Sequence, residues 1–293
     1  MTSATRTSRR IDPAEAKNPL DNPVESNKEI DSLLKSTVTD YPTPGLPPDD
    51  LVVLPGGLVD SGMVVRNVVV RELTGEDEEA LARAVRGGNF FHYIDTLLER
   101  GTVAIGNHRE QADVRKQLKS LLVGDRDAVV LGIRRATYGD DIEIKDWICP
   151  SCGEESNISM TVEDIPVGEM DDPVAENTFT VKLRRGRSAR VRLANGYDQA
   201  AVFENLKLSQ AERDTLLLSR CVLVLTESDG SERTLAGFPS VARGMSMPDR
   251  KTILKEMYER QPGPRFNDVK HTHGACGKEV NIAVNIDSLF LDA

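Results

Sequence analysis

The chain of 293 residues has few cysteines, few aromatic residues and no long apolar run. The four cysteines (Cys149, Cys152, Cys221 and Cys276) are too few for a disulfide scaffold of this length. No stretch approaches 18 uncharged apolar residues, and the N-terminus lacks a signal-peptide core, so we expect neither secretion nor a membrane span. Acidic residues outnumber basic ones by 47 to 37, which argues against a broad phosphate-binding surface.

Sequence signatures of catalysis are also missing. The chain has no Gly-x-Gly-x-x-Gly or P-loop pattern for a nucleotide, no Gly-x-Ser-x-Gly turn and no His-Glu-x-x-His helix. These patterns place a phosphate, a nucleophile or a catalytic metal beside a substrate. We therefore predict that the protein is not an enzyme and has no catalytic or organic-cofactor-binding residues.

The first 50 residues differ in composition from the rest of the chain. They hold seven of the 15 prolines, separated mainly by Ser, Thr, Asn and Asp, and such a segment cannot bury enough apolar surface to fold alone. We expect an extended N-terminal arm over residues 1–50. Within it, Ile30, Leu33 and Leu34 would share one helical face. That helix is either transient in a flexible tail, or it docks on a neighbouring subunit and orders on binding.

The remaining chain contains an internal repeat. A shift of 124 positions aligns residues 125–165 with residues 249–289 without a gap and gives eight identities. Chance would give about two from average composition. We predict two divergent copies of one unit, at residues 51–169 and 170–293.

Each copy is predicted to combine strands with helices, which makes the fold class α+β. A Val-rich strand is expected at residues 63–73, and a β-hairpin at residues 179–193, where apolar and polar residues alternate. Ser209 with Glu212 has the pattern of a capping box, and Ser246 before Pro248 is a typical helix start. Helices are expected at residues 76–86, 90–100, 110–122, 125–137, 197–206, 209–220 and 248–260.

Two short motifs have the spacing of metal ligands. In Cys149-Pro-Ser-Cys152-Gly, a tight turn closed by glycine lets two thiolates point at one ion. The repeat aligns this motif with His273-Gly-Ala-Cys276-Gly, the predicted second knuckle. We therefore predict a Cys3His zinc site formed by Cys149, Cys152, His273 and Cys276. A β-like run follows each knuckle, which is the hairpin-on-hairpin arrangement of a zinc ribbon.

Other interpretations of these residues were weighed against the repeat. His271 competes with His273 as the fourth ligand, although the register of the repeat favours His273. A redox dithiol would need a βαβ context and no second knuckle. Cys221 lies in an apolar run without a partner at ligand spacing, so we expect it in the core. Four protein ligands leave no open position for water, so the Zn2+ is predicted to be structural.

One basic segment stands out in the acidic chain. Residues 182–192 contain six basic residues, alternating in part with apolar ones. We interpret the segment as a hairpin with one buried and one solvated face, or as a surface for an acidic protein partner. Nucleic-acid binding would need exposed aromatic residues, and the segment has none.

Several segments together resemble a known family. They are a Pro-Gly-Gly segment at residues 54–58, ELTGEDEEAL at residues 72–81, and GDRDAVVLGIRRATYGDDIEIKDWICPSCGEE at residues 124–155. These are similar to the baseplate hub and hub-assembly proteins of contractile-tailed bacteriophages of the T-even type. The resemblance covers residues 51–157, and the second knuckle and the last four residues are in keeping with it. The family pattern carries Cys where this chain has His273.

The resemblance implies a non-enzymatic structural or assembly protein of the tail baseplate, in its hub or wedge region. Such a protein would be made in the host cytoplasm and would act in the virion tail. Its partners would be other baseplate and tail proteins, with the N-terminal arm docking on a neighbour, and neither a membrane nor a nucleic acid is expected. The alternative class is a zinc-ribbon nucleic-acid-binding or transcription adaptor protein.

Overall fold

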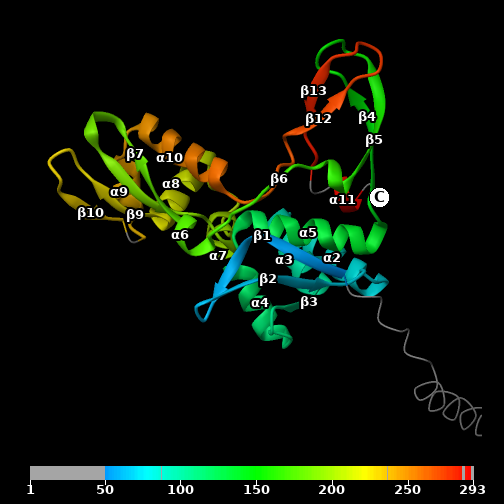
Figure 1. The fold of residues 1–293 in the computed structure, drawn as a ribbon, viewed down its shortest axis with the longest axis horizontal. Helices are drawn as coiled ribbons and strands as arrows, with labels where there is room; N and C mark the ends of the chain where they lie inside the picture. The colour runs from blue at the N-terminus through cyan, green and yellow to red at the C-terminus, as the bar shows by residue number, and fades with distance from the viewer. Residues whose placement is uncertain (1–49, 87, 236, 286–287, 292–293) are drawn as a thin grey trace, which may run out of the picture. The chain divides into compact units, whose positions relative to one another are not determined.

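The computed structural model describes residues 50–291, except residues 87, 236, 286 and 287 (Figure 1). In this range helices and antiparallel strands are mixed, so the predicted α+β class is confirmed. The predicted N-terminal arm, up to residue 49, lies outside the described residues. No helix in the described range is both long and apolar enough to cross a bilayer.

The first part of the chain forms a three-stranded antiparallel sheet with four helices. The sheet order is β1-β2-β3, and β1 pairs with β2 as a hairpin. Val68 and Val70 of β2 are fully buried, as the Val-rich pattern predicts. The elements are β1 (Asp50–Asp60), β2 (Met63–Val70), α2 (Gly75–Val85), α3 (Phe90–Gly101), β3 (Thr102–Ile105), α4 (Gln111–Ser120) and α5 (Val123–Tyr138).

A later part of the chain forms a second antiparallel sheet of four strands, in the order β10-β9-β8-β7. The predicted hairpin corresponds to β7 and β8, with Val181, Ala189 and Val191 turned into the core. The elements are β7 (Thr178–Lys182), β8 (Ser188–Arg192), α7 (Gly196–Phe203), α8 (Gln210–Cys221), β9 (Val222–Thr226), β10 (Glu232–Thr234), α9 (Pro239–Gly244) and α10 (Met247–Arg260).

Two further hairpins follow α5 and α10. Each is a separate two-stranded antiparallel sheet. The first is β4 (Asp141–Ile148) with β5 (Glu155–Thr161), and the second is β12 (Val269–Thr272) with β13 (Glu279–Ile282). Short elements complete the chain: β6 (Val167–Gly168), which pairs with β11 (Gly263–Pro264), and the helices α6 (Pro173–Glu176) and α11 (Ser288–Leu291).

The buried apolar residues form two main clusters. One joins the β1-β2-β3 sheet, helices α3, α4 and α5, and both late hairpins; Ile158 of β5 and Ile282 of β13 belong to it. The other lies between the β7–β10 sheet and helices α8, α9 and α10. Thus the second hairpin packs with the core of the first part of the chain, although it follows α10 in sequence.

The order of elements is similar in residues 50–161 and 178–282, although the second segment has two additional strands, β10 and β11. Each segment begins with a hairpin, continues with two helices and a strand that pairs with the second strand of that hairpin, and then has two more helices and a final hairpin. Hydrogen bonds recur at matching positions: Arg126 donates to the Leu118 carbonyl at 3.0 Å, and Arg250 donates to the Ala242 carbonyl at 3.2 Å.

The seven predicted helices correspond to α2, α3, α4, α5, α7, α8 and α10, with ends that differ by up to three residues. The capping box of Ser209 with Glu212 is present, and the side chain of Ser246 caps α10. Strands β9 and β10 and helix α9 were not predicted. β9 is a run of five residues that continues directly from α8, so no turn residue marks its start.

Candidate metal centre

The first knuckle is the turn between β4 and β5. Its backbone closes because the Gly153 N–H donates to the Cys149 carbonyl at 2.8 Å, and the Cys149 N–H donates to the Glu154 carbonyl at 2.9 Å. Gly153 has a φ of 75°, in the left-handed region that glycine enters without steric cost. The turn thereby holds both cysteine side chains on the same side of the hairpin end.

The second knuckle repeats this geometry between β12 and β13. The Gly277 N–H donates to the His273 carbonyl at 2.8 Å, and the His273 N–H donates to the Lys278 carbonyl at 3.0 Å. Gly277 has a φ of 65°. The two turns therefore share their hydrogen bonds and their left-handed glycine, as the alignment of the two motifs predicts.

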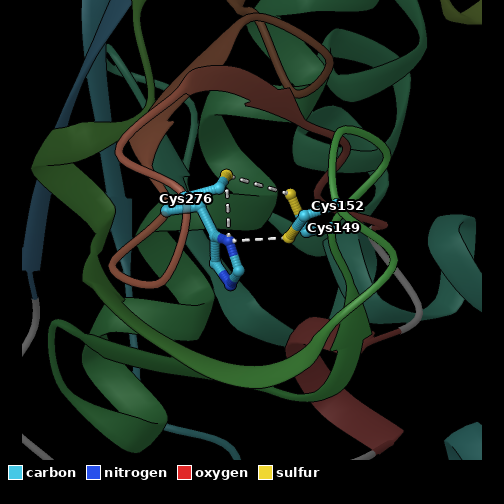
Figure 2. A group of neighbouring side chains, drawn as sticks. Cys149, Cys152 and Cys276 are labelled. Carbon is cyan, nitrogen blue, oxygen red and sulfur yellow. Dashed lines mark hydrogen bonds between the residues drawn. The ribbon is translucent and has the colours of Figure 1, made fainter.

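The structure brings the four predicted ligands together. In Figure 2, Cys276 from one hairpin faces Cys149 and Cys152 from the other. The Cys149 and Cys276 sulfur atoms are 4.0 Å apart, and His273 Nδ1 lies 3.4 Å from each of the Cys152 and Cys276 sulfur atoms. All four ligand atoms lie within 4.8 Å of one another.

These distances fit one tetrahedral zinc ion. With Zn–S bonds of about 2.3 Å and Zn–N bonds of about 2.0 Å, ligand atoms around the ion lie about 3.5–3.8 Å apart. The donor set, three sulfur atoms and one imidazole nitrogen, is also the soft set that zinc prefers over calcium or magnesium. The residues present thus suit zinc in both spacing and chemistry.

The site is enclosed on one side and open on the other. Cys149 and His273 are 1% and 2% exposed, whereas Cys152 is exposed and Cys276 is half-buried. Burial would raise the pKa of the Cys149 thiol, but backbone N–H groups of Ser151 and Cys152 help to bring it below its ordinary value. Hydrogen bonds of this kind favour the thiolate, which is the form that binds metal.

The alternative ligand His271 and the remaining cysteine, Cys221, both lie outside the ligand group. His271 is in β12, where its ring contacts Trp147 edge-on at 6.1 Å between centroids, and it is not in the ligand group. Cys221 is fully buried in the second core, as predicted. Burial, with the neighbouring Asp198 carboxylate, raises the pKa of Cys221 to about 12. That thiol is therefore protonated and packs as an apolar group.

The basic segment is a hairpin with one buried face, but its charges are not all solvated. Arg187 pairs with the buried Asp249, and Arg192 pairs with the buried Asp198 at 2.6 Å. The remaining basic residues are exposed and form no ion pair with a described residue: Lys182, Arg184, Arg185 and Arg190. The surface open to a partner is therefore smaller than the composition of the segment suggests.

Buried aspartates in the first turns of helices are the main feature that sequence reasoning missed. Asp77 of α2 accepts two hydrogen bonds from Arg71, at 2.8 and 3.0 Å, and Asp198 of α7 accepts from Arg192 and Arg220. Burial alone would raise the pKa of Asp198, but the bonds from these arginines hold it below its ordinary value. The sequence signal that could have predicted these pairs is the Arg-x5-Asp spacing, which occurs at Arg71–Asp77 and at Arg192–Asp198.

Comparison with known proteins returned one family. The family model described as "T4 bacteriophage base plate protein" matches residues 60–291. This range is well over half of the chain and includes β2 and β3 of the first sheet, the whole second sheet, both knuckles and all four candidate ligands. No curated protein and no solved structure matches the chain.

Proposed function

The chain belongs to the family of T4 bacteriophage base plate proteins, and from this we propose that it is a structural or assembly component of the baseplate of a contractile tail, in its hub or wedge region. The family match over residues 60–291 is the observation that carries the proposal. The protein acts by contact with other tail proteins and not by catalysis. It is made in the host cytoplasm and acts in the virion tail baseplate.

The metal centre has a structural role in this proposal. Cys149, Cys152, His273 and Cys276 bind one Zn2+ and leave no open position for a substrate or water. The ion links two hairpins that are more than 120 positions apart in the sequence. In zinc-dependent peptides this kind of closure is worth on the order of 10 kcal/mol. The two joined hairpins would form a ribbon-like lobe.

The body of the protein arose as two copies of one unit, residues 51–169 and 170–293. Three observations support this: the shared order of elements, the matching hydrogen bonds and the matching knuckle turns. The second knuckle has His273 in the place of Cys149, so the two copies together supply one metal site. Duplication gives the protein two related sets of helical surfaces for its neighbours.

Partners bind through these helical surfaces and through the N-terminal arm, which docks on a neighbouring tail protein. The four exposed basic residues of the β7–β8 hairpin suit an acidic protein surface. A nucleic-acid adaptor has less support, because two of the six basic residues are engaged by buried aspartates and no aromatic residue interrupts the segment.

Mass spectrometry of purified phage particles tests the proposal. A structural component is expected in mature tails at a constant copy number. An assembly factor is expected to be absent from mature tails, while phages that lack its gene accumulate incomplete baseplates. If the protein is missing from particles and its deletion leaves tail assembly normal, the proposed function is wrong.

A further inference from the structure

The single tryptophan of the chain lies beside the candidate metal centre. Trp147 is in β4, two positions before Cys149. Its ring contacts the His273 ring edge-on, with 5.8 Å between centroids, and the His271 ring edge-on at 6.1 Å. Aromatic rings at such distances and angles attract each other. Trp147 therefore contacts both the candidate ligand and the histidine that competes with it in the sequence.

A β-bulge in β4 turns Trp147 toward these rings. Ile144 pairs with Ile158 and Trp147 with Ser156, so three positions along β4 match two along β5. Because side chains alternate along a strand, a regular β4 would place Ile148 on the face of Ile144. The extra residue places Trp147 there instead. The burial agrees, since Trp147 packs on the first core, whereas Ile148 is 63% exposed.

The bulge is held by a specific hydrogen bond. Asp146 has a φ of 52°, in the left-handed region that few residues other than glycine adopt, although Asp tolerates it. The Asp146 N–H donates to Asn157 Oδ1 of β5 at 3.1 Å. Bulges occur often beside functional sites, where they change the direction of a side chain. The unusual backbone at Asp146 thus accompanies the inward direction of Trp147.

The second hairpin has no bulge at the matching place. The pairing of β12 with β13 runs without a register shift. The 124-position shift of the repeat aligns His271 with Trp147 and His273 with Cys149. The two rings that precede the knuckles therefore occupy equivalent positions and contact each other. An imidazole can bind a metal, whereas the indole N–H only donates a hydrogen bond.

The orientation of the His273 ring decides whether it can act as a ligand. Its Nδ1 lies 3.4 Å from each of the Cys152 and Cys276 sulfur atoms. Half a turn of the ring would replace Nδ1 with a carbon atom. Within the described range, the hydrogen bonds of this ring are those to the two sulfur atoms, and Trp147 packs against it. Groups outside the ligand set that orient a histidine strengthen metal binding.

We propose that Trp147 is a positioning residue of the metal centre. It holds the His273 imidazole with Nδ1 toward the cysteine sulfur atoms, and it keeps His271 outside the ligand group. The bulge at Asp146 aims the indole at both rings. Trp147 does not bind the metal itself and acts through His273. This inference rests on the zinc site of the proposed function.

Zinc affinity of the full-length protein tests the proposal, measured by competition with a chelator under reducing conditions. Trp147→Ala is expected to weaken Zn2+ binding by about tenfold or more, as is typical when a group that orients a metal ligand is lost. Trp147→Phe keeps an aromatic ring and should retain most of the affinity. Ile148→Ala changes the next, exposed position and should bind as wild type. Unchanged affinity in Trp147→Ala would overturn the proposal.

The visible absorption spectrum of the Co2+-substituted protein separates positioning from a general loss of stability, because it depends on the ligands and geometry of the ion. We expect a changed spectrum for Trp147→Ala and a wild-type spectrum for Trp147→Phe and Ile148→Ala. A wild-type spectrum for Trp147→Ala, with equal losses of unfolding free energy in the metal-free and zinc-bound forms, would show that Trp147 is only a packing residue.

A double variant tests the exclusion of His271. If this histidine enters the ligand group when the indole is absent, Trp147→Ala combined with His271→Ala will differ in its Co2+ spectrum from Trp147→Ala alone. Identical spectra would contradict that part of the proposal.

Two further comparisons keep the result decisive. Trp147→Leu keeps an apolar side chain on the first core but has no ring, and it replaces Trp147→Ala if that variant does not fold, with the same expected results. Wild-type protein that binds no zinc would contradict the metal centre itself. Zinc-loaded wild type, with variants of unchanged affinity and spectrum, would contradict only the role of Trp147.

Discussion

At the scale of single residues, two aspartates at matching positions have opposite electrostatic environments. Asp249 accepts hydrogen bonds from the Arg184 N–H and from the Arg187 guanidinium, and its pKa lies below the ordinary value although burial acts to raise it. Burial raises the pKa of Asp125 to about 6. The Gly56 N–H donates a hydrogen bond to Asp125 at 2.6 Å and acts to lower this pKa, but burial has the larger effect. The second Asp125 oxygen is buried without a partner among the described residues.

The difference follows from one arginine. Arg66 in β2 and Arg187 just before β8 are 121 positions apart, but Arg66 donates to the carbonyls of Leu54 and Pro55 and not to Asp125. The negative charge of Asp125 is thus less well compensated than that of Asp249. A carboxyl group whose pKa is raised on folding stabilises the protein at low pH and loses that contribution as pH rises through the folded-state pKa.

We predict that Asp125→Asn changes the pH dependence of stability. The wild-type protein loses stability between the ordinary Asp pKa of 3.8 and the folded-state value of about 6. Asn keeps an acceptor for the Gly56 N–H but carries no charge. Relative to wild type, the variant should gain up to roughly 3 kcal/mol in unfolding free energy between about pH 4 and 7.5. Urea unfolding across this range measures the gain.

Asp249→Asn provides the matched control for that experiment. Because the pKa of Asp249 is lowered on folding, its charge stabilises the protein above pH 4, and that contribution disappears as pH falls below this value. The Asp249→Asn variant should therefore be least stable relative to wild type near neutral pH. Parallel pH profiles for wild type and Asp125→Asn would show that Asp125 is ionised normally.

At the scale of secondary structure elements, a close backbone contact connects α5 to the segment after α10. Gly124 lies in the first turn of α5, and a Cβ atom there would come within 1.5 Å of the Pro262 carbonyl oxygen. Gly263 continues the contact with a φ of 110°. The start of α5 and the segment after α10 therefore approach closely only because both segments carry glycine, at Gly124 and Gly263.

We predict that Gly124→Ala destabilises the protein by about 3 kcal/mol, the upper range for an overpacked site, although alanine favours helices by about 1 kcal/mol. Gly75→Ala is the matched control, because it is also a first-turn helical glycine and a Cβ there meets nothing within 4 Å. That variant should be unchanged or slightly more stable. Chemical denaturation measures both, and equal effects would show that the Gly124 contact is not tight.

At the scale of the whole molecule, the candidate metal centre brings together residues from distant parts of the chain. The hairpins that bear the two knuckles each contribute residues to the first core, such as Ile158 and Ile282. The four candidate ligands in the knuckle turns do not belong to that core cluster, and Cys152 is exposed. Bound Zn2+ is therefore expected to hold the knuckles together where apolar packing does not.

We predict that purified protein contains about one zinc ion per chain and that His273→Ala removes it, because a Cys3His site does not tolerate loss of its imidazole. His271→Ala and Cys221→Ala should keep the metal, since neither residue belongs to the ligand group. Elemental analysis measures the content, and thermal unfolding with and without a chelator measures the stabilisation. If the His273→Ala variant retains zinc and the His271→Ala variant loses it, His271 and not His273 is the fourth ligand.

Much of the local structure could be predicted because its signals are local. The capping box of Ser209 with Glu212 and the cap at Ser246 mark where α8 and α10 begin. Arg187 and Arg192 show where such reasoning ends. Their sequence context indicates solvated basic residues, but each pairs with a buried aspartate from another element, so their surroundings depend on contacts that local patterns do not encode.

The sequence by itself determined the seven longer helices, the β7–β8 hairpin and the two knuckles, because capping, apolar alternation and ligand spacing act within a few residues. It also pointed to the family, since the motifs are contiguous. Only the tertiary structure decided that His273 and not His271 joins the three cysteines, and that the second hairpin packs on the first core. These outcomes depend on packing between distant segments, which fixes distances that spacing along the chain leaves free.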